Sequence, residues 1–416
     1  MKNALVSFKG NKQIQTEITL TGSKSECNRA LIISALSKGV VAVENMSNAA
    51  DTVTLNRILT ELSLESPHQQ TVDVGPAGTA MRFLTAFLAS TKGKFLLTGS
   101  ERMKQRPIGI LAEALIAIGA DISYAEQEGF PPVLIQGPLK QSTESVKIKG
   151  DISSQYISAL LMVAPTLSKG LTLDIQGELT SLPYVKMTLD MLAEAGISHH
   201  WEGNKISIKP QDFKKATLTI EPDWSAASYW YSIAALADKA AIALPYLKNK
   251  SLQGDSRIRE IMVDFGVETV PSGNGITLTT IDKNFSEELL DLKDCPDLAQ
   301  TVIVCAAVLG KNLKFTGLET LKIKETDRVL ALQNELGKIG VSLVEDNLIY
   351  TLNCDNLHFP DQITIKTYDD HRMAMAFAPI ALLINEMVIE DMDVVEKSYP
   401  DFWKDLEKAG FSITEN

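Results

Sequence analysis

A sixfold repeat constrains the fold of this chain more than any single motif does. A small or helix-capping residue followed by an almost wholly apolar run recurs at intervals of about 70 residues. The six runs begin at Ser25, Gly78, Ser153, Ser225, Pro296 and Asp370. Because they are apolar on nearly every face, each predicts a helix buried in the core.

A similar series of segments follows each buried helix. A short strand-like run comes first, then a loop and a second, amphipathic helix, then further extended segments. Five second helices end in a similar phrase, such as "IGADI" or "AGFSI", whose glycines are Gly119, Gly196, Gly266, Gly340 and Gly410. A unit of this kind buries its first helix only against copies of itself. We therefore predict an α/β fold of two lobes, each with three helix–sheet repeats packed around buried parallel helices, an inside-out α/β barrel.

The repeats also predict the domain boundaries. Lobe one should comprise residues 22–223, and lobe two should comprise residues 224–416 with residues 1–21 pairing back onto it. The hinges are expected near 21–23 and 221–225, close to the phrase "IEPDWSAAS".

Charge and hydropathy exclude several classes of function. The net charge of −12 argues against nucleic acid as the main partner. The longest apolar run, Met373–Ile384, contains Pro379 and is shorter than the roughly 18 residues of a membrane span. The N-terminus has no apolar segment typical of a signal peptide. The four cysteines have neither CxxC spacing nor nearby histidines, so we expect no metal site and a cytoplasmic location.

The unusual polar residues fall at two equivalent places of the repeats. One is the start of the buried helix: Lys24, Ser25, Arg29, Gly78, Thr79, Arg82, Ser153, Ser154, Gln155, Asp297, Asp370, His371 and Arg372. The other is the loop before the second helix: Arg102, Arg106, Ser181, Tyr184, Lys322, Lys324, Glu325, Arg328 and Lys397. Helix N-termini attract anions, and Arg and Lys add positive charge. The pattern therefore predicts a ligand with several negative groups.

Three acids among these cations, Asp297, Glu325 and Asp370, are candidates for proton transfer. Neighbouring cations favour the ionised carboxylate while burial disfavours it, and the sequence leaves the balance open. Simpler explanations also exist. The segment "KIKETDRV" is compatible with a solvated helix start, "GPAGTA" with a turn, and "SSQY" with an N-cap. Their matching positions in the repeat favour the functional interpretation.

At these residues the chain resembles the enolpyruvyl transferases, specifically the EPSP synthase (3-phosphoshikimate 1-carboxyvinyltransferase) family. The motifs occur in order: "GSKSECNRAL", "AGTAMRFLTA", "RMKQRPIGIL", "ISSQYISALLM", "CPDLAQT", "KIKETDR", "YDDHRMAMAF" and "EKSYPDFW". The resemblance implies two lobes that close over the substrates by induced fit. It also implies transfer of the enolpyruvyl group of phosphoenolpyruvate to the 5-hydroxyl of shikimate 3-phosphate, in the shikimate pathway to chorismate and the aromatic amino acids. No metal or organic cofactor is implied; glyphosate is the expected inhibitor, and we expect a monomer.

The resemblance also implies roles for individual residues. Those expected to bind shikimate 3-phosphate are Lys24, Ser25, Arg29, Ser153, Ser154, Gln155, Ser181, Tyr184, Asp297 and Lys324. Those expected to bind phosphoenolpyruvate are Lys24, Gly78, Arg102, Gln155, Arg328, Arg372 and Lys397, with Thr79, Asp370 and His371 supporting. Asp297 is the expected base, Glu325 the expected acid, and Lys324 and Lys24 are expected to assist catalysis.

The chain departs from the family pattern at four positions near these motifs. Pro76 replaces a usual Asn, Phe83 a frequent Pro, Thr320 a frequent Asn, and Lys322 a usual Arg. Proline lacks both the amide side chain and a backbone N–H, so one contact near phosphoenolpyruvate is in doubt. We expect an active enzyme with altered affinity for phosphoenolpyruvate and glyphosate.

Two alternative functions use the same fold. One is the sister enolpyruvyl transferase that acts on UDP-N-acetylglucosamine, which carries a reactive Cys before an "RP" pair. Here that loop reads "GSERMKQRP", without cysteine. The other is a non-catalytic anion-binding scaffold, for which Pro76 and Thr320 are the only support. Retention of the acids and cations together argues against it.

Overall fold

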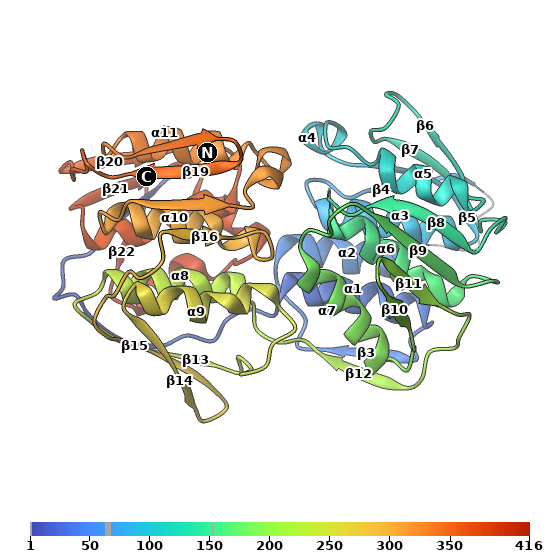
Figure 1. The fold of residues 1–416 in the computed structure, drawn as a ribbon, viewed down its shortest axis with the longest axis horizontal. Helices are drawn as coiled ribbons and strands as arrows, with labels where there is room; N and C mark the ends of the chain where they lie inside the picture. Colours follow the sequence, from blue (N-terminus) through green and yellow to red (C-terminus); the bar gives the residue numbers. More distant parts are fainter. Residues whose placement is uncertain (1, 63–67, 152) are drawn as a thin grey trace. The chain divides into compact units, whose positions relative to one another are not determined.

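The chain divides into two compact units, one of residues 22–220 and one of residues 1–21 with 221–416. The structure, a computed structural model, describes residues 2–62, 68–151 and 153–416. In Figure 1 the first unit runs from blue to green, and the second runs from yellow to red and includes the blue N-terminal strands.

Three helices form the interior of the unit 22–220. They are α1 (Lys24–Leu36), α3 (Gly78–Ser90) and α6 (Ser154–Val163), and they pack against one another. The surrounding sheets have the orders β4-β5-β7-β6 (Gln70–Asp73, Gly93–Thr98, Val133–Gly137, Asp121–Tyr124), β8-β9-β11-β10 (Ser145–Lys149, Leu171–Gln176, Lys205–Ile208, His200–Glu202) and β12-β3 (Ala216–Thr219, Val41–Glu44). The second helices are α2 (Ala50–Glu61), α5 (Gly109–Ala117) and α7 (Leu182–Glu194).

The other unit repeats this plan. Its central helices are α8 (Trp224–Leu236), α10 (Ala299–Val308) and α12 (His371–Phe377). Its sheets have the orders β2-β13-β15-β14 (Gln13–Glu17, Lys239–Pro245, Gly275–Thr280, Val267–Ser272), β16-β17-β19-β18 (Leu289–Asp291, Leu313–Thr316, Ile349–Asn353, Ser342–Asp346) and β20-β21-β1-β22 (Gln362–Ile365, Glu386–Ile389, Ala4–Ser7, Ser412–Glu415). The second helices are α9 (Ile258–Asp264), α11 (Arg328–Gly337) and α13 (Phe402–Lys408). The predicted α/β fold with three helix–sheet repeats in each unit is confirmed.

The first and fourth repeats exchange strands. Strand β2 precedes α1 in the chain but pairs in parallel with β13, while β12 precedes α8 but pairs in parallel with β3. Among its described residues, the first repeat has no antiparallel strand pair after α2, which fits the interval between Ser25 and Gly78, the shortest of the five. In the last repeat, β1 pairs with both β21 and β22 and completes the sheet.

Each central helix connects a pair of parallel strands in the regular repeats. Thus α3 lies between β4 and β5, α6 between β8 and β9, α10 between β16 and β17, and α12 between β20 and β21. Such a crossover places the helix on one face of its sheet. The helix starts therefore occupy equivalent places in the repeats, and these are the places where the sequence carries its polar motifs.

Glycines and prolines end the helices as their chemistry requires. All five glycines of the repeated phrase have positive φ. A Cβ at Gly119 or Gly340 would lie 2.0 or 2.1 Å from a backbone carbonyl oxygen. The apolar run Met373–Ile384 is not one helix, because α12 ends at Phe377 and a 3-10 helix, η5 (Ala378–Leu382), takes over at Pro379. No helix in the described parts of the chain is long and apolar enough to cross a membrane.

Candidate active site

An alternating chain of acids and bases occupies one part of the unit formed by residues 1–21 and 221–416. We call it the charged cluster; its members are Asp297, Glu325, Arg328, Asp370, Arg372 and Lys397. They come from two repeats: the 3-10 helix η3 (Pro296–Leu298) before α10, the loop after η4 (Glu319–Ile323), the starts of α11 and α12, and the end of η6 (Met392–Lys397). Sequence analysis named all six, and the fold brings all six together.

Arg328 is the centre of the charged cluster. It is the first residue of α11, is 2% exposed, and contacts three carboxylates. Its Nε lies 2.7 Å from Asp370 Oδ2, its Nη1 3.1 Å from Asp297 Oδ1, and its Nη2 2.9 Å from Glu325 Oε2. A planar guanidinium suits this arrangement, because its donors point in fixed directions.

Two further cations, Lys397 and Arg372, contact carboxylates that Arg328 also contacts. Lys397 Nζ lies 3.0 Å from Glu325 Oε1, so Glu325 is shared between Lys397 and Arg328. Arg372 Nη2 lies 2.8 Å from Asp297 Oδ2, so Asp297 is shared between the two arginines. Lys324 is half-buried beside Glu325. Each proposed proton-transfer group therefore contacts two cations.

The N-terminus of α12 fixes two members of the charged cluster. Asp370 is the N-cap, and its Oδ1 accepts a hydrogen bond from the backbone N–H of Arg372 at 2.8 Å. Its other oxygen, Oδ2, accepts from Arg328. His371, 1% exposed, has its Nδ1 3.7 Å from Asp370 Oδ1. The capping carboxylate thus links two helix starts.

Burial and charge act in opposite directions on these cations. Burial lowers the pKa of Arg328, but the charges of Asp370, Glu325 and Asp297 outweigh it and raise the pKa overall. The pKa of Arg372 is raised in the same way, chiefly by Asp297. Both guanidiniums are therefore charged over the whole physiological range.

Sequence analysis missed a second layer around Arg372. Its Nη1 donates to the hydroxyl of Tyr229 at 3.4 Å, and its Nη2 donates to Ser225 Oγ at 3.3 Å. Ser225 in turn donates to Asp255 Oδ2. Their positions in the repeat could have indicated both residues. Ser225 lies in the first turn of the fourth buried helix, and Asp255 lies in the loop before the fourth repeat's second helix.

In the unit 22–220, Arg29 occupies a comparable central position. It is 2% exposed. Its Nε donates to Thr188 Oγ1 at 2.7 Å, its Nη2 to Ser158 Oγ at 3.1 Å, and its Nη1 to the carbonyl of Ser25 at 2.8 Å. These hydrogen-bond acceptors are all uncharged, and burial lowers the pKa of Arg29 to about 10. Thr188 and Ser158 were not predicted, since both look like ordinary helix residues.

Phe83 contacts this arginine. The ring of Phe83 is fully buried, and its centroid lies 5.4 Å from Arg29 Cζ; the Tyr184 ring lies on the same guanidinium at 5.8 Å. The departure from the family's frequent proline therefore places an aromatic face against a cation.

Other predicted residues of this unit make specific contacts. Lys24 Nζ lies 3.3 Å from Asp51 Oδ2, an acid that sequence analysis missed because α2 lacks the repeated glycine phrase. Gln155 Nε2 donates to Thr79 Oγ1 at 3.1 Å and so links the starts of α6 and α3. A Cβ at Gly78 would lie 2.6 Å from Arg106 Nη1 and 2.8 Å from Arg82 Nη1, so a larger residue here would displace the two guanidiniums.

The predicted serines differ in their local roles. Ser153 is the N-cap of α6 and accepts from Gln155 N at 3.3 Å, so the simple capping explanation holds for its side chain in this structure. Ser154 is buried as the first helical residue. Ser181 precedes α7 with φ of 56° and makes no capping bond. A non-glycine residue held at positive φ is strained, and such strain is common at functional sites.

Four further residues lie nearer the surface. Arg102, on the short helix α4 (Glu101–Lys104), has its Nη1 3.3 Å from Gln105 Oε1. Pro76 is exposed in the turn before α3, whose N-cap Ala77 offers no side-chain bond. Lys322 donates to Glu345 Oε2 at 2.6 Å, and Thr320 is half-buried on the same 3-10 helix.

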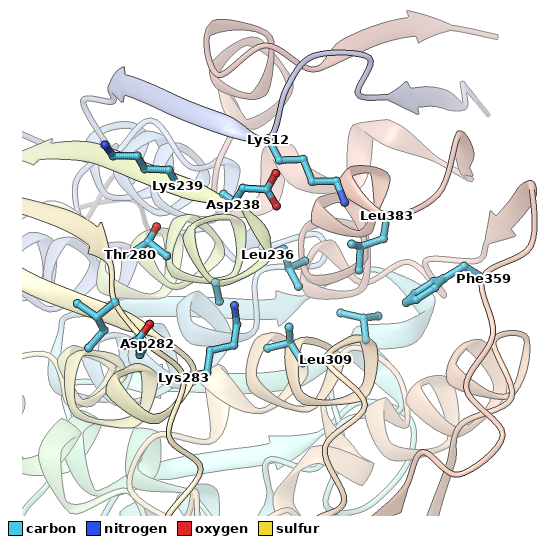
Figure 2. Close-up of a pocket in the computed structure, with 14 residues that line it drawn as sticks. Lys12, Leu236, Asp238, Lys239, Thr280, Asp282, Lys283, Leu309, Phe359 and Leu383 are labelled. Atoms are coloured by element: carbon cyan, nitrogen blue, oxygen red, sulfur yellow. The ribbon is translucent and has the colours of Figure 1, made fainter.

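A hollow of about 850 Å³ lies at the opposite ends of the central helices from the charged cluster. Leu236 of α8 and Leu309 after α10 line it, with Lys12, Lys239 and Lys283 around them (Figure 2). No predicted site residue lines it. The charged cluster is therefore identified by side-chain chemistry and not by this hollow.

Known proteins share this fold and this sequence. A solved EPSP synthase structure from Acinetobacter baumannii superposes with a TM-score of 0.76 and 20% sequence identity, covering 100% of both chains. A 3-phosphoshikimate 1-carboxyvinyltransferase from Bacteroides fragilis (strain YCH46) is 47% identical over 407 residues, covering 96% of this chain and 97% of the relative. One from Shewanella oneidensis is 32% identical over 419 residues, covering 94% and 96%.

The two units, each with three central helices inside three sheets, and the charged cluster define a two-lobed α/β transferase. The family model of EPSP synthase (3-phosphoshikimate 1-carboxyvinyltransferase) matches residues 8–406. The chain belongs to the EPSP synthase family.

Proposed function

We propose that this chain transfers the enolpyruvyl group of phosphoenolpyruvate to the 5-hydroxyl of shikimate 3-phosphate, releasing phosphate. This step belongs to the shikimate pathway, toward chorismate and the aromatic amino acids. The observation that carries the proposal is the charged cluster, in which Glu325 and Asp297 each contact two cations. Paired proton transfer to and from a polyanion needs carboxylates that exchange protons and cations that stabilise negative charge, both in one place.

Phosphoenolpyruvate would be held by its two anionic ends. Arg328, Arg372 and Lys397 supply the central positive charge, with Lys24, Gly78, Arg102 and Gln155 as the further proposed contacts. Among the described residues, the buried Nε of Arg372 has no hydrogen-bond partner. A buried donor of this kind costs stability unless a ligand satisfies it, so the carboxylate of phosphoenolpyruvate is its proposed partner.

The bound anion would also activate the acid. In this structure Lys397 and Arg328 stabilise the ionised carboxylate of Glu325. When phosphate and carboxylate oxygens engage the same cations, Glu325 loses part of that stabilisation and takes up a proton more readily. The substrate thereby favours the protonated form that the first step requires.

The proposed reaction is an addition followed by an elimination. Glu325 gives its proton to the methylene carbon C3 of phosphoenolpyruvate, which makes C2 electrophilic. The 5-hydroxyl oxygen adds to C2, and its proton passes to Asp297, with Lys324 and Lys24 nearby in the proposed site. A proton from C3 then returns to the Glu325 carboxylate as the C2–O bond to phosphate breaks, and the leaving phosphate takes up the proton held by Asp297. The cations stabilise the charge that moves during both steps.

Shikimate 3-phosphate would bind mainly to the unit 22–220. Among the described residues, the hydrogen-bond acceptors of Arg29 are uncharged, and a buried guanidinium of this kind suits the shikimate carboxylate, with Ser25 beside it. Ser153, Ser154 and Ser181 are the proposed phosphate contacts, and Tyr184 and Gln155 would line the ring. Asp297 would bond the ring hydroxyls.

The remaining features of the proposal follow from the family resemblance. We propose that the enzyme works without metal or organic cofactor, as a monomer in the cytoplasm, and that glyphosate inhibits it by occupying the phosphoenolpyruvate site. We propose no role for nucleic acid or membrane. Thr79, Asp370 and His371 would support the substrate contacts.

A direct assay tests the proposed function. Purified protein with phosphoenolpyruvate and shikimate 3-phosphate should release phosphate at a rate of order 1–10³ per second, the usual range for enzymes. Release with UDP-N-acetylglucosamine in place of shikimate 3-phosphate should be undetectable. A protein that binds both anions but releases no phosphate would support the non-catalytic scaffold instead.

Pro76 offers a test of substrate affinity. Replacing Pro76 by Asn adds an amide donor at the N-terminal end of α3, which has no side-chain cap. Because a hydrogen bond to a charged group contributes about 1.5–3 kcal/mol, we expect the KM for phosphoenolpyruvate and the glyphosate inhibition constant to fall about tenfold, with kcat changed little. Steady-state kinetics of both proteins measures this, and unchanged constants would refute it.

A further inference from the structure

One buried acid near the charged cluster is not used by the proposed mechanism. Asp255 is 2% exposed and lies on the 3-10 helix η2 (Gly254–Arg257), which leads into α9. This is the loop before the second helix of the fourth repeat. The equivalent loops of the fifth and sixth repeats supply Glu325 and Lys397. Asp255 therefore occupies the position in the fourth repeat that is equivalent to those loops.

A continuous series of hydrogen bonds joins Asp255 to the proposed base. Asp255 Oδ2 accepts from Ser225 Oγ, and Ser225 Oγ accepts from Arg372 Nη2 at 3.3 Å. The same Nη2 lies 2.8 Å from Asp297 Oδ2. Each member of the series comes from a different element: η2, α8, α12 and η3. Asp255 is thus linked to Asp297 through Ser225 and Arg372.

This series restrains an otherwise flexible side chain. An arginine loses rotamer entropy when it is fixed in one position, so contacts with its neighbours must hold it. Nη1 bonds the Asp297 carbonyl at 3.2 Å and the Tyr229 hydroxyl at 3.4 Å. Nη2 contacts the Asp297 carboxylate and also donates to Ser225 Oγ at 3.3 Å, and this hydroxyl is in turn held by Asp255.

We propose that Asp255 is a positioning residue for the enolpyruvyl transfer: through Ser225 it orients the Arg372 guanidinium toward phosphoenolpyruvate and toward Asp297. This inference rests on the proposed function. It assigns Asp255 no contact with either substrate. Its loss should therefore weaken phosphoenolpyruvate binding more than it slows the chemical steps.

The charge of Asp255 comes at a cost to stability. Burial and, after it, the charge of Asp297 raise the pKa of Asp255, Arg372 opposes the rise, and the pKa lies at about 7; Asp223 and Cys295 also face this carboxyl. Because the folded pKa is above the unfolded value, ionisation destabilises the folded protein progressively from about pH 4 to pH 7. Relative to wild type, the Tm of Asp255→Asn should therefore be higher at pH 8 than at pH 5.

Four variants test the positioning role. We expect Asp255→Ala and Ser225→Ala each to raise the KM for phosphoenolpyruvate about tenfold or more, with kcat lowered less and the KM for shikimate 3-phosphate within twofold. The double variant should be no worse than the poorer single variant, because both act through one series of bonds. Asp255→Asn keeps an acceptor for Ser225 and should recover most of the lost affinity.

A matched control separates positioning from general structural support. Asp405 is also 1% exposed and accepts from Tyr399 and Lys408, outside the charged cluster. Asp405→Asn should lower Tm without changing the KM for phosphoenolpyruvate. Asp255→Ala with a lower Tm but an unchanged KM, or additive losses in the double variant, would overturn the inference while leaving the proposed function intact. A wild type that releases no phosphate would refute the function itself.

Discussion

Glu325→Gln should lower kcat by about 10²–10⁴-fold, the usual contribution of a general acid. Glutamine keeps an oxygen that Lys397 and Arg328 can contact at the positions where they lie 3.0 and 2.9 Å from the native carboxylate. Binding and folding should therefore change little, whereas an amide cannot give a proton to carbon. Phosphate release measures the loss in turnover.

An isotope experiment makes the Glu325 prediction specific to proton transfer. In deuterated water, wild type should incorporate deuterium into the methylene carbon of phosphoenolpyruvate during turnover, because that carbon gains and then loses a proton. Glu325→Gln should incorporate it at least about a hundredfold more slowly. Glu319→Gln, an exposed acid on the neighbouring 3-10 helix, is the matched control and should behave as wild type.

A different pattern of turnover losses would identify another residue as the general acid. His371, at the start of α12, is 1% exposed and lies close to Asp370. Its imidazole is the alternative to Glu325 as the proton donor. If Glu325→Gln retained most of its turnover while His371→Asn lost several orders of magnitude, the proton donor would be His371. We expect His371→Asn to remain largely active.

The repeat explains why much of the site could be predicted. Polar residues at equivalent helix starts and loops are brought together by equivalent crossovers, so Asp297, Glu325 and Arg372 could be grouped before the structure was known. Ser225 and Asp255 occupy the equivalent places of the fourth repeat, but the helix start "SAASYW" carries no charged side chain that marks it as part of a site.

Other features depend on tertiary contacts that no local pattern encodes. The pairing of β12 with β3 crosses from one repeat's sequence to another's, and nothing in "ATLT" specifies that partner. Asp51 meets Lys24 only because α2 folds back against α1. Thr188 and Ser158 are uncharged helix residues whose importance comes from the arginine that lies between them.

The prediction with the largest effect on stability concerns Arg328. Replacing Arg328 by Leu leaves Asp370, Glu325 and Asp297 close together without their shared cation. Removing one partner of a buried ion pair typically costs about 3–5 kcal/mol, so the free energy of unfolding should fall by at least that amount. Arg328→Lys should recover only part of it, since one ammonium cannot contact three carboxylates in the same geometry.

Urea unfolding followed by circular dichroism measures the Arg328 effect, with Arg57→Leu as the control. Arg57 pairs with Glu61 on the surface of α2 and is more than half exposed, so its loss should cost no more than about 1 kcal/mol. The Arg328→Leu deficit should be smaller at pH 5 than at pH 8, because protonation relieves the repulsion among the three carboxylates. A deficit below about 1 kcal/mol at pH 8 would mean that water or rearranged cations replace Arg328, and that the charged cluster does not depend on its central arginine.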